Sequence, residues 1–270
     1  MAQRKVSARK KPDEIEERAR LSAPVVYQVV CEEGRNEMGR PVLSLLWSGI
    51  AAGVSVSVSL LAQAILRSHL PDTPWRALVS DLGYTVGFLM VILGRQQLFT
   101  ENTITVVLPL LSEFSRRNLF LLGRTWSIIL VANIAGTLCA ALFYSFAPAF
   151  SEDIRAAMLQ LSQEGLSHGW WEMLFRAVPA GFLMAALVWL IPSAEGTEFH
   201  VIMVMTYLIA AGGFAHVVAG SVEGFMLVLD GQWPWPHFLT HFLAPVVIGN
   251  SIGGTALFAA LSYGQVKEEM

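Results

Sequence analysis

Long uncharged runs alternate with short polar segments along most of this 270-residue chain. The first run, residues 43–66, has no charged residue over 24 positions. That length crosses a hydrocarbon core of about 30 Å at about 1.5 Å per residue. Five further apolar segments lie at residues 78–111, 119–146, 173–191, 199–229 and 238–263. The pattern predicts an all-α integral membrane protein with six transmembrane spans at residues 41–264, between an N-terminal segment, 1–40, and a C-terminal tail, 265–270.

The second segment is too long, and too polar at its centre, to be one plain helix. Residues 94–102 read GRQQLFTEN, and residues 104–111 are apolar again. We therefore expect two half-helices joined by a loop near residues 99–102. The alternative is a helix that ends at Gly94 and continues as an interfacial tail.

The fifth segment contains a second predicted interruption. Gly212 and Gly213 stand just before His216, near the middle of an uncharged run at 201–222. Irregular backbone at membrane depth is tolerated only where protein buries it or where it lines a cavity, and an ionisable residue there points to function. The alternative is a buried histidine in an ordinary helix.

The interrupted spans are the middle members of two sets of three. With three spans in each set, the second set enters the membrane from the opposite side. This arrangement predicts an inverted 3+3 repeat of aquaporin-like architecture, with a site near the midplane. The aquaporin-type Asn-Pro-Ala pair does not occur in the sequence.

The charge distribution predicts orientation. Only 14% of the residues are charged, against about 25% in typical soluble domains. With the N-terminus inside, thirteen basic residues lie on the cytoplasmic side and four on the other. Because basic residues concentrate in cytoplasmic loops, we expect both termini to be cytoplasmic, in a bacterial-type inner membrane. A mixed-charge run at 13–20 predicts a short solvated helix, and the first few residues are expected to be disordered.

Small residues recur four positions apart in four of the spans, an arrangement that lets helix backbones approach closely. This predicts a compact bundle and favours an oligomer. The pairs are Gly49/Gly53, Gly83/Gly87, Gly220/Gly224 and Gly249/Gly253.

Three motifs resemble the formate/nitrite transporter family, and within it the YfdC-like branch. They are Leu98-Phe99-Thr100 with Asn102, Gly213-Phe214 with His216, and Gly249-Asn250-Ser251-Ile252-Gly253-Gly254. With the six-span layout, the resemblance covers about residues 40–265.

The resemblance implies a homopentamer in which each protomer holds its own pore for small monovalent anions of weak acids, such as formate or nitrite. By this resemblance His216 is the central pore histidine, Thr100 is its partner on the facing loop, and Leu98 and Phe99 form part of a constriction. Glu101 and Phe214 belong to the same pore segments. A bare anion at the midplane is costly, and a histidine that donates a hydrogen bond or a proton lowers that cost.

The sequence departs from the family pattern at several positions. Gln97 and Ala215 stand where the family has glutamates, Glu101 stands where it has a glycine, and Gly220 replaces an asparagine. The lysine expected on the outer side near the fourth span is missing, since no lysine lies between residues 11 and 267. An isolated carboxylate at Glu101 would repel anions, so we expect it to pair with Arg95 or to be partly protonated.

Other groupings carry less weight. Tyr84 and Phe88 share a helical face and form a candidate outer gate, or simply pack. His237 and His241 have a spacing that could present two metal ligands, but no third ligand is evident, so we expect no metal site and no cofactor. Ser221 lacks the sequence surroundings of a hydrolase nucleophile, so we do not expect the protein to be an enzyme.

The sequence thus predicts a channel or secondary transporter for small weak-acid anions, with membrane lipid and a small-molecule or ion substrate as its partners. A net charge of −3 without a basic patch gives no sign of nucleic-acid binding. Two alternatives stay open. One is a pore for a small neutral or cationic solute, which Glu101 and Glu223 would suit. The other is a membrane scaffold or sensor with a closed pore.

Overall fold

The computed structural model describes residues 21–269, and these fold into helices joined by short loops, without strands in that range. The predicted helix at 13–20 and the expected disorder of the first residues lie outside this part. Five helical stretches are long and apolar enough to cross a membrane: Val42–His69, Arg76–Leu93, Arg116–Phe146, Trp170–Ser193 and Trp235–Val266. Three shorter apolar stretches lie at Asn102–Ser112, Glu198–Ala211 and Val217–Leu229.

The first half of the described chain runs from α2 to α8. Its α-helices are α2 (Ala23–Gly39), α3 (Val42–His69), α4 (Arg76–Ser80), α5 (Tyr84–Leu93), α6 (Asn102–Thr105), α7 (Val107–Ser112) and α8 (Arg116–Phe146). A short 3-10 turn, η1 (Asp81–Gly83), joins α4 to α5. Ser115 caps α8 by accepting a hydrogen bond from the Asn118 amide at 3.1 Å, as serine commonly does at a helix start.

The second half runs from α9 to α15. Its elements are α9 (Glu152–Leu166), α10 (Trp170–Leu190), the 3-10 turn η2 (Ile191–Ser193), α11 (Glu198–Ala211), α12 (Val217–Leu229), α13 (Trp235–His237), the π-helical η3 (Phe238–Leu243), α14 (Ala244–Ser251), the π-helical η4 (Ile252–Ala259) and α15 (Ala260–Val266). The polar segment between the third and fourth apolar segments contains α9, which starts at a Ser151 cap followed by two acidic residues. Acidic side chains in the first turn stabilise a helix start.

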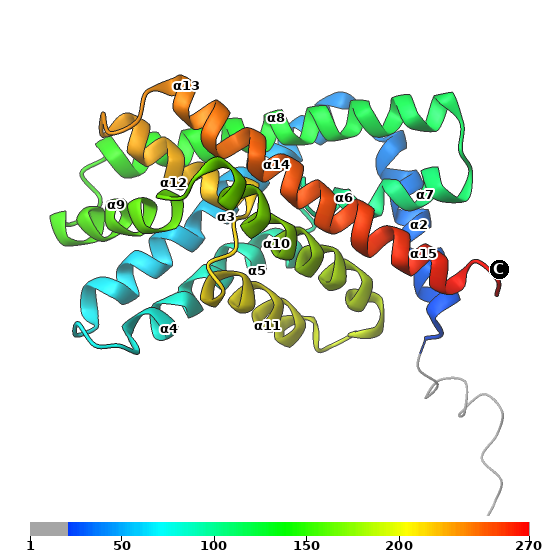
Figure 1. The fold of residues 1–270 in the computed structure, drawn as a ribbon, viewed down its shortest axis with the longest axis horizontal. Coiled ribbons are helices and arrows are strands. Elements are labelled where there is room, and N and C mark those ends of the chain that lie inside the picture. Colours follow the sequence, from blue (N-terminus) through cyan, green and yellow to red (C-terminus); the bar gives the residue numbers. More distant parts are fainter. Residues whose placement is uncertain (1–20, 270) are drawn as a thin grey trace, which may run out of the picture.

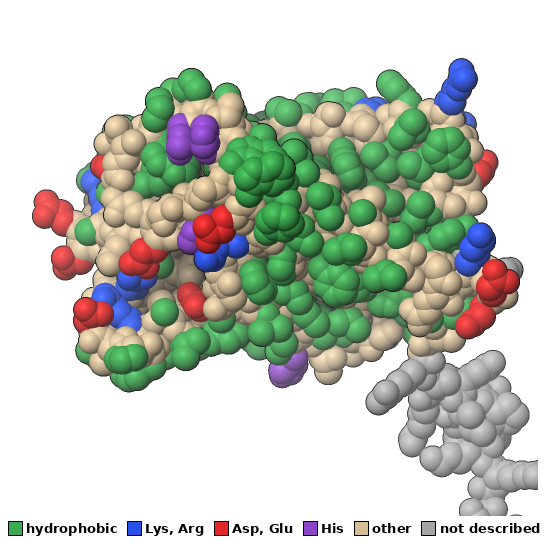
Figure 2. Space-filling model, in the orientation of Figure 1, with side chains coloured by type: hydrophobic (Ala, Val, Ile, Leu, Met, Phe, Trp, Pro, Cys, Tyr) green, Lys and Arg blue, Asp and Glu red, His purple; other side chains and the backbone are tan. Residues whose placement is uncertain are grey.

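The two ends of the described chain lie side by side, with the ring of Tyr27 on α2 against the ring of Tyr263 on α15. Helices α2 and α15 lie at one end of the bundle, and α4, α9 and α13 lie at the other (Figure 1). Hydrophobic side chains cover much of the visible face between these ends, and charged side chains gather toward the ends (Figure 2). This distribution suits a protein surrounded by lipid at its middle.

Glycines set the closest helix contacts, as the spacing of small residues predicts. At all eight positions of the four pairs, an added Cβ atom would lie within 3.0 Å of a neighbouring helix. Gly53 on α3 meets the backbone of Asn133 and Gly136 on α8, and Gly253 meets Val178 on α10. The predicted close packing is confirmed at these positions.

We expect Gly53→Ala to lower stability, because its methyl group would overlap the Asn133 carbonyl oxygen. Forcing such an overlap costs about 1–3 kcal/mol. Unfolding of the purified protein in detergent measures the effect. Gly123→Ala on α8 is the matched control, since no neighbouring atom lies within 4 Å of its Cβ position, and it should be neutral or stabilising by up to about 1 kcal/mol. Equal stability of the two variants would contradict the packing argument.

Candidate pore site

The first interruption separates α5 from α6. Helix α5 ends at Leu93, Arg95 takes a left-handed conformation with φ of 49°, and helix resumes at Asn102. The break thus begins at Gly94, earlier than the predicted loop near 99–102. After the turn the chain re-enters the protein, where Leu98, Phe99 and Thr100 are at most 1% exposed. This burial excludes the alternative of an interfacial tail.

The second interruption separates α11 from α12. Helix α11 ends at Ala211, and Gly213 adopts a φ of +61° that favours glycine. Arg176 on α10 holds this turn, because its guanidinium donates to the Gly213 carbonyl oxygen at 3.0 Å and its own carbonyl accepts from the Ala215 amide at 3.1 Å. Helix α12 then starts with His216 as its N-cap.

Asn133 on α8 satisfies the backbone of the first interruption. Its Oδ1 accepts from the Phe99 amide at 2.9 Å, and its Nδ2 donates to the carbonyl oxygens of Gln97 and Gly49, both at 2.8 Å. One buried side chain therefore serves three backbone groups on two segments. Sequence reasoning missed Asn133, although an asparagine inside the third apolar segment was a signal that could have found it.

Asn250 on α14 does the same for the second interruption. Its Oδ1 accepts from the Val217 amide at 2.8 Å, and its Nδ2 donates to the carbonyl oxygens of Ala177 at 2.7 Å and Ala215 at 2.9 Å. Each interruption is thus tied to the helix before it and the helix after it by one asparagine. Asn250 belongs to the Gly249–Gly254 motif that carries part of the family resemblance.

The two interruptions meet at a hydrogen bond between Thr100 and His216. Thr100 Oγ1 lies 2.8 Å from His216 Nε2, and His216 Nδ1 accepts from the Ala219 amide at 3.1 Å. An accepting Nδ1 leaves the proton of a neutral ring on Nε2, so His216 donates to Thr100. The predicted approach of His216 and the Thr100 loop is confirmed. Phe88 packs edge-on against the imidazole, with ring centroids 5.0 Å apart.

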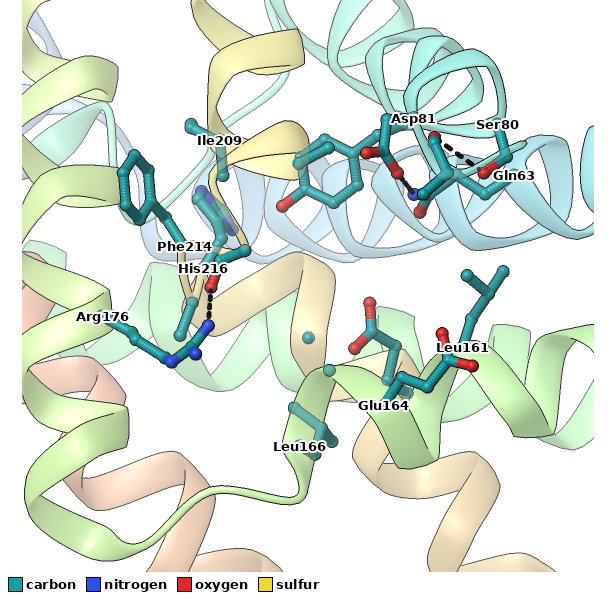
Figure 3. A pocket seen from close by; sticks show the side chains of 18 of the residues that line it. Gln63, Ser80, Asp81, Leu161, Glu164, Leu166, Arg176, Ile209, Phe214 and His216 are labelled. Carbon is teal, nitrogen blue, oxygen red and sulfur yellow. Dashed lines mark hydrogen bonds between the residues drawn. The ribbon is translucent and has the colours of Figure 1, made fainter. Parts of the chain in front are cut away.

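A cavity of about 240 Å³ reaches His216 from the α9 end of the bundle. We call it the α9-side cavity. In Figure 3, His216, Phe214 and Arg176 lie on one wall, Gln63, Ser80 and Asp81 on a second, and Leu161, Glu164 and Leu166 on a third. Tyr84 and Glu223 also line it. Arg67 and Glu164 form an ion pair at 2.6 Å beside it.

A second cavity, of about 470 Å³, opens toward α2. We call it the α2-side cavity. Its charged lining consists of Glu33, Glu37, Arg95, Glu101 and Glu198, and Gln97 and Asn102 lie at its inner part. Burial raises the pKa of Glu33, an effect that nearby Arg95 opposes and Glu37 reinforces. Negative charge therefore exceeds positive charge in this cavity.

A thin, buried barrier separates the two cavities. Leu98, Phe99 and Thr100 line neither cavity, Thr100 contacts His216 of the α9-side cavity, and Glu101, the next residue, lines the α2-side cavity. The Phe99 ring is itself held by Trp126, with centroids 5.5 Å apart. One hydrogen bond and two apolar side chains thus stand between two polar cavities.

Comparisons with known proteins identify the family. A model of the formate/nitrite transporters matches residues 24–264. The chain belongs to the formate/nitrite transporter family. Inner membrane protein YfdC of Escherichia coli K12 is 40% identical over 255 residues, which cover 94% of this chain and 82% of that protein. Formate channel FocA of Haemophilus influenzae is 26% identical, over 80% of this chain and 84% of that protein.

Solved structures of family members share the fold. A pentameric formate channel with formate bound superposes with a TM-score of 0.72 at 18% identity, covering 84% of this chain and 98% of that one. A channel described as an FNT family ion channel gives a TM-score of 0.74, also at 18% identity. The resemblance drawn from the sequence motifs, including its YfdC-like branch, is confirmed.

The structure corrects the expected partner of Glu101. Arg95 Nη1 lies 3.8 Å from Glu33 Oε1 on α2, and Glu101 has no ion pair among residues 21–269. Of the two expected alternatives for Glu101, the pair with Arg95 is therefore wrong, and partial protonation stays a prediction. The left-handed turn at Arg95 directs the chain inward while its side chain stays 87% exposed, which leaves the half-buried Glu101 on its own.

The remaining predicted residues fall around the barrier or away from it. The rings of Tyr84 and Phe88 pack against each other at a tilt of 38°, with centroids 5.1 Å apart, and Tyr84 lines the α9-side cavity. Asn102 donates to the Leu98 carbonyl oxygen at 2.9 Å and so closes the first interruption.

His237 and His241 stack 4.3 Å apart at the surface, and no group of three metal-ligating side chains occurs in the described part of the chain. The Ser221 hydroxyl donates to the Val217 carbonyl oxygen at 2.6 Å.

We expect Asn133→Ala and Asn250→Ala to have similar, large effects on stability. Each removes the partner of three buried backbone groups, at about 1–3 kcal/mol for each group. Unfolding in detergent measures the loss, and hydrogen exchange at the Phe99 and Val217 amides locates it. Asn118→Ala on the exposed start of α8 is the control and should change stability by less than about 1 kcal/mol. A small effect of either core variant would contradict the proposed role of the amides.

The variants His216→Asn and His216→Leu distinguish what the two hydrogen bonds of this ring contribute to stability from what its volume contributes. Asparagine offers an oxygen to cap α12 and an amide that donates to Thr100, whereas leucine offers neither. We expect His216→Leu to be less stable than His216→Asn by about 0.5–2 kcal/mol, the range for loss of an N-cap. Thermal unfolding in detergent measures this difference, and equal stability would show that the cap is not needed.

Proposed function

We propose that this protein is a multi-pass inner-membrane channel or secondary transporter for small monovalent weak acids of the formate and nitrite type. The observation that carries the proposal is the thin barrier between the two cavities. In this proposal, solute reaches His216 from the α9 side and Glu101 from the α2 side, and it crosses the buried segment of Leu98, Phe99 and Thr100 between them.

The barrier suits a solute that crosses without net charge. Leu98 and Phe99 offer no partner to an anion, and burial of an unpaired charge is expensive. Thr100 accepts a hydrogen bond from His216, so its own hydroxyl hydrogen is free to turn toward a passing solute. A weak acid that is protonated on one side and ionised on the other meets these conditions.

The pore architecture that we propose is an inverted repeat of six spans. In it α5 with α6 and α7 forms the second span, and α11 with α12 forms the fifth. The two asparagines support this assignment, because they lie in the third and sixth spans and make equivalent bonds to the interrupted span and to the first span of each set. The close glycine contacts are also equivalent, because Gly53 meets the backbone carbonyl of Asn133 and Gly181 meets the backbone carbonyl of Asn250.

We further propose that protomers assemble as a homopentamer with both termini in the cytoplasm. The pentameric formate channel of the same fold supports the assembly. Large exposed apolar side chains, such as Trp47, Phe120 and Phe175, each at least 66% exposed in the single chain, supply surface for lipid and for neighbouring protomers.

A second candidate function is passage of a small neutral or cationic solute. The carboxylates that line both cavities favour passage of a neutral or cationic solute over passage of an anion. Glu33, Glu37, Glu101 and Glu198 face one arginine in the α2-side cavity, and Asp81, Glu164 and Glu223 face two arginines in the other. Uptake into proteoliposomes of formate, nitrite, hydrosulfide, ammonium and glycerol, measured in parallel, decides between the two. Flux of ammonium or glycerol with formate and nitrite at background would replace the first proposal by the second.

We expect Glu101→Gln to raise formate and nitrite flux severalfold, because it removes the negative charge that this unpaired carboxyl group carries whenever it is ionised, while keeping the side chain's size. Glu101→Gly should act in the same direction. Flux into liposomes at pH 7 measures the effect. Glu32→Gln, on the exposed face of α2 and outside both cavities, carries the same charge change and should leave flux unaltered. Equal flux in the Glu101 and Glu32 variants would show that Glu101 does not limit anion entry.

A further inference from the structure

Glu223 is a carboxylic acid inside the bundle that the pore assignment leaves without a task. It lies on α12, seven residues after His216, which places it two turns or about 10 Å further along the same helix. Both residues line the α9-side cavity. A carboxylate inside a membrane span is expensive, and such residues commonly mark a solute or proton pathway.

The other charged groups of this cavity have partners. Arg67 pairs with Glu164 at 2.6 Å, and Arg176 pairs with Glu172 at 3.1 Å and also donates to the Gly213 carbonyl oxygen. Asp81 accepts a hydrogen bond from Gln63 at 3.0 Å. Within residues 21–269, Glu223 has neither a hydrogen bond nor an ion pair to its carboxyl group.

The fold leaves space for this carboxyl group. A Cβ atom at Gly165 on α9 would lie 3.0 Å from Glu223 Oε2, so a larger residue at position 165 would crowd the Glu223 carboxyl group. Glu223 is half-buried, and the Glu164 side chain beside the cavity is 52% exposed, so water reaches this region. The titratable and charged side chains that line the cavity with Glu223 are Arg67, Asp81, Tyr84, Glu164, His168, Arg176 and His216, from α3, η1, α5, α9, the loop before α10, α10 and the N-cap of α12.

His216 is poorly placed to supply a proton itself. Its Nδ1 accepts from the Ala219 amide and its Nε2–H donates to Thr100. Loss of the Nε2 proton would leave an imidazole ring without any proton, which is far outside ordinary histidine chemistry. The ring orients Thr100 and the barrier, and a proton for the solute has to come from another group in the cavity.

We propose that Glu223 is the proton donor and acceptor of the α9-side cavity and exchanges one proton with each weak-acid solute. The inference rests on the proposed function. A formate ion in the cavity takes the proton: the O–H bond of the Glu223 carboxyl group breaks, an O–H bond forms on formate, and formic acid crosses the barrier without charge. The Glu223 carboxylate then takes a proton from hydronium in the cavity. Because Glu223 has no ion pair to lose, it gains and loses this proton without breaking one.

The decisive experiment measures formate uptake and internal pH together, in proteoliposomes with an enclosed pH dye. Glu223→Gln keeps the size and polarity of the side chain but holds no exchangeable acid proton. We expect formate uptake and the accompanying acidification to fall at least tenfold, and the remaining flux to depend little on pH between pH 5 and 8. Glu223→Asp should restore part of both. Glu152→Gln, at the exposed start of α9, is the control for the charge change and should match the parent protein.

The outcomes separate this inference from the proposed function. If the parent protein carries neither formate nor nitrite, the proposed function fails and this inference fails with it. If the parent protein carries formate and Glu223→Gln has the same uptake, acidification and pH profile, the role of Glu223 is refuted and the proposed function stands. Size-exclusion chromatography of each variant shows whether assembly is intact.

A chemical probe tests Glu223 without any transport. N,N′-Dicyclohexylcarbodiimide reacts with protonated carboxyl groups, and mass spectrometry locates the adduct. We expect labelling of Glu223 in the parent protein, less labelling as the pH rises, and none at the ion-paired Glu164. Labelling of Glu164 with Glu223 unmodified would overturn the proposal.

Discussion

Backbone groups inside a membrane must find partners within the protein, and this constraint governs the centre of the molecule. Two interrupted helices expose amide and carbonyl groups at Gln97, Phe99, Ala215 and Val217, and two asparagine side chains satisfy them. Each asparagine also bonds a carbonyl oxygen on a third helix. The amides therefore join three helices at a time, and the close glycine contacts beside them let those helices come near enough for the bonds to form.

The geometry of the pore follows from these bonds. Asn133 holds the chain directly before Thr100, and Asn250 holds the chain directly on either side of His216. The hydrogen bond between Thr100 and His216 therefore joins two segments that are each fixed from behind. Because His216 also caps α12, the ring has one tautomer and one orientation. A side chain held in this way is a fixed hydrogen-bond donor to Thr100.

The sequence was informative wherever the physical cause was local. Glycines and polar residues inside apolar runs predict both interruptions, and His216 stands out because ionisable residues are rare in such runs. Asn133 escaped notice because its partners lie 34, 36 and 84 residues away, and no local pattern indicates them. The pair of Arg95 with Glu101 was wrongly predicted because the actual partner, Glu33, lies on α2. This helix precedes the first span in the sequence but packs against the segment that follows the first interruption. Helix α9 was not predicted, because in sequence the polar positions of an amphipathic surface helix resemble those of a loop.

An acidic lining and a weak-acid solute are compatible if selection acts at the barrier rather than at the entrances. Carboxylates in both cavities lower the local concentration of anions, and this limits the rate of entry. They also raise the local concentration of hydronium, which increases the fraction of a weak acid that is protonated at the barrier. The neutral form is the one that Leu98 and Phe99 admit at low cost. An anion of a strong acid meets the same repulsion and gains nothing from the added protons, so under the proposed function the acidic lining disfavours chloride more than formate.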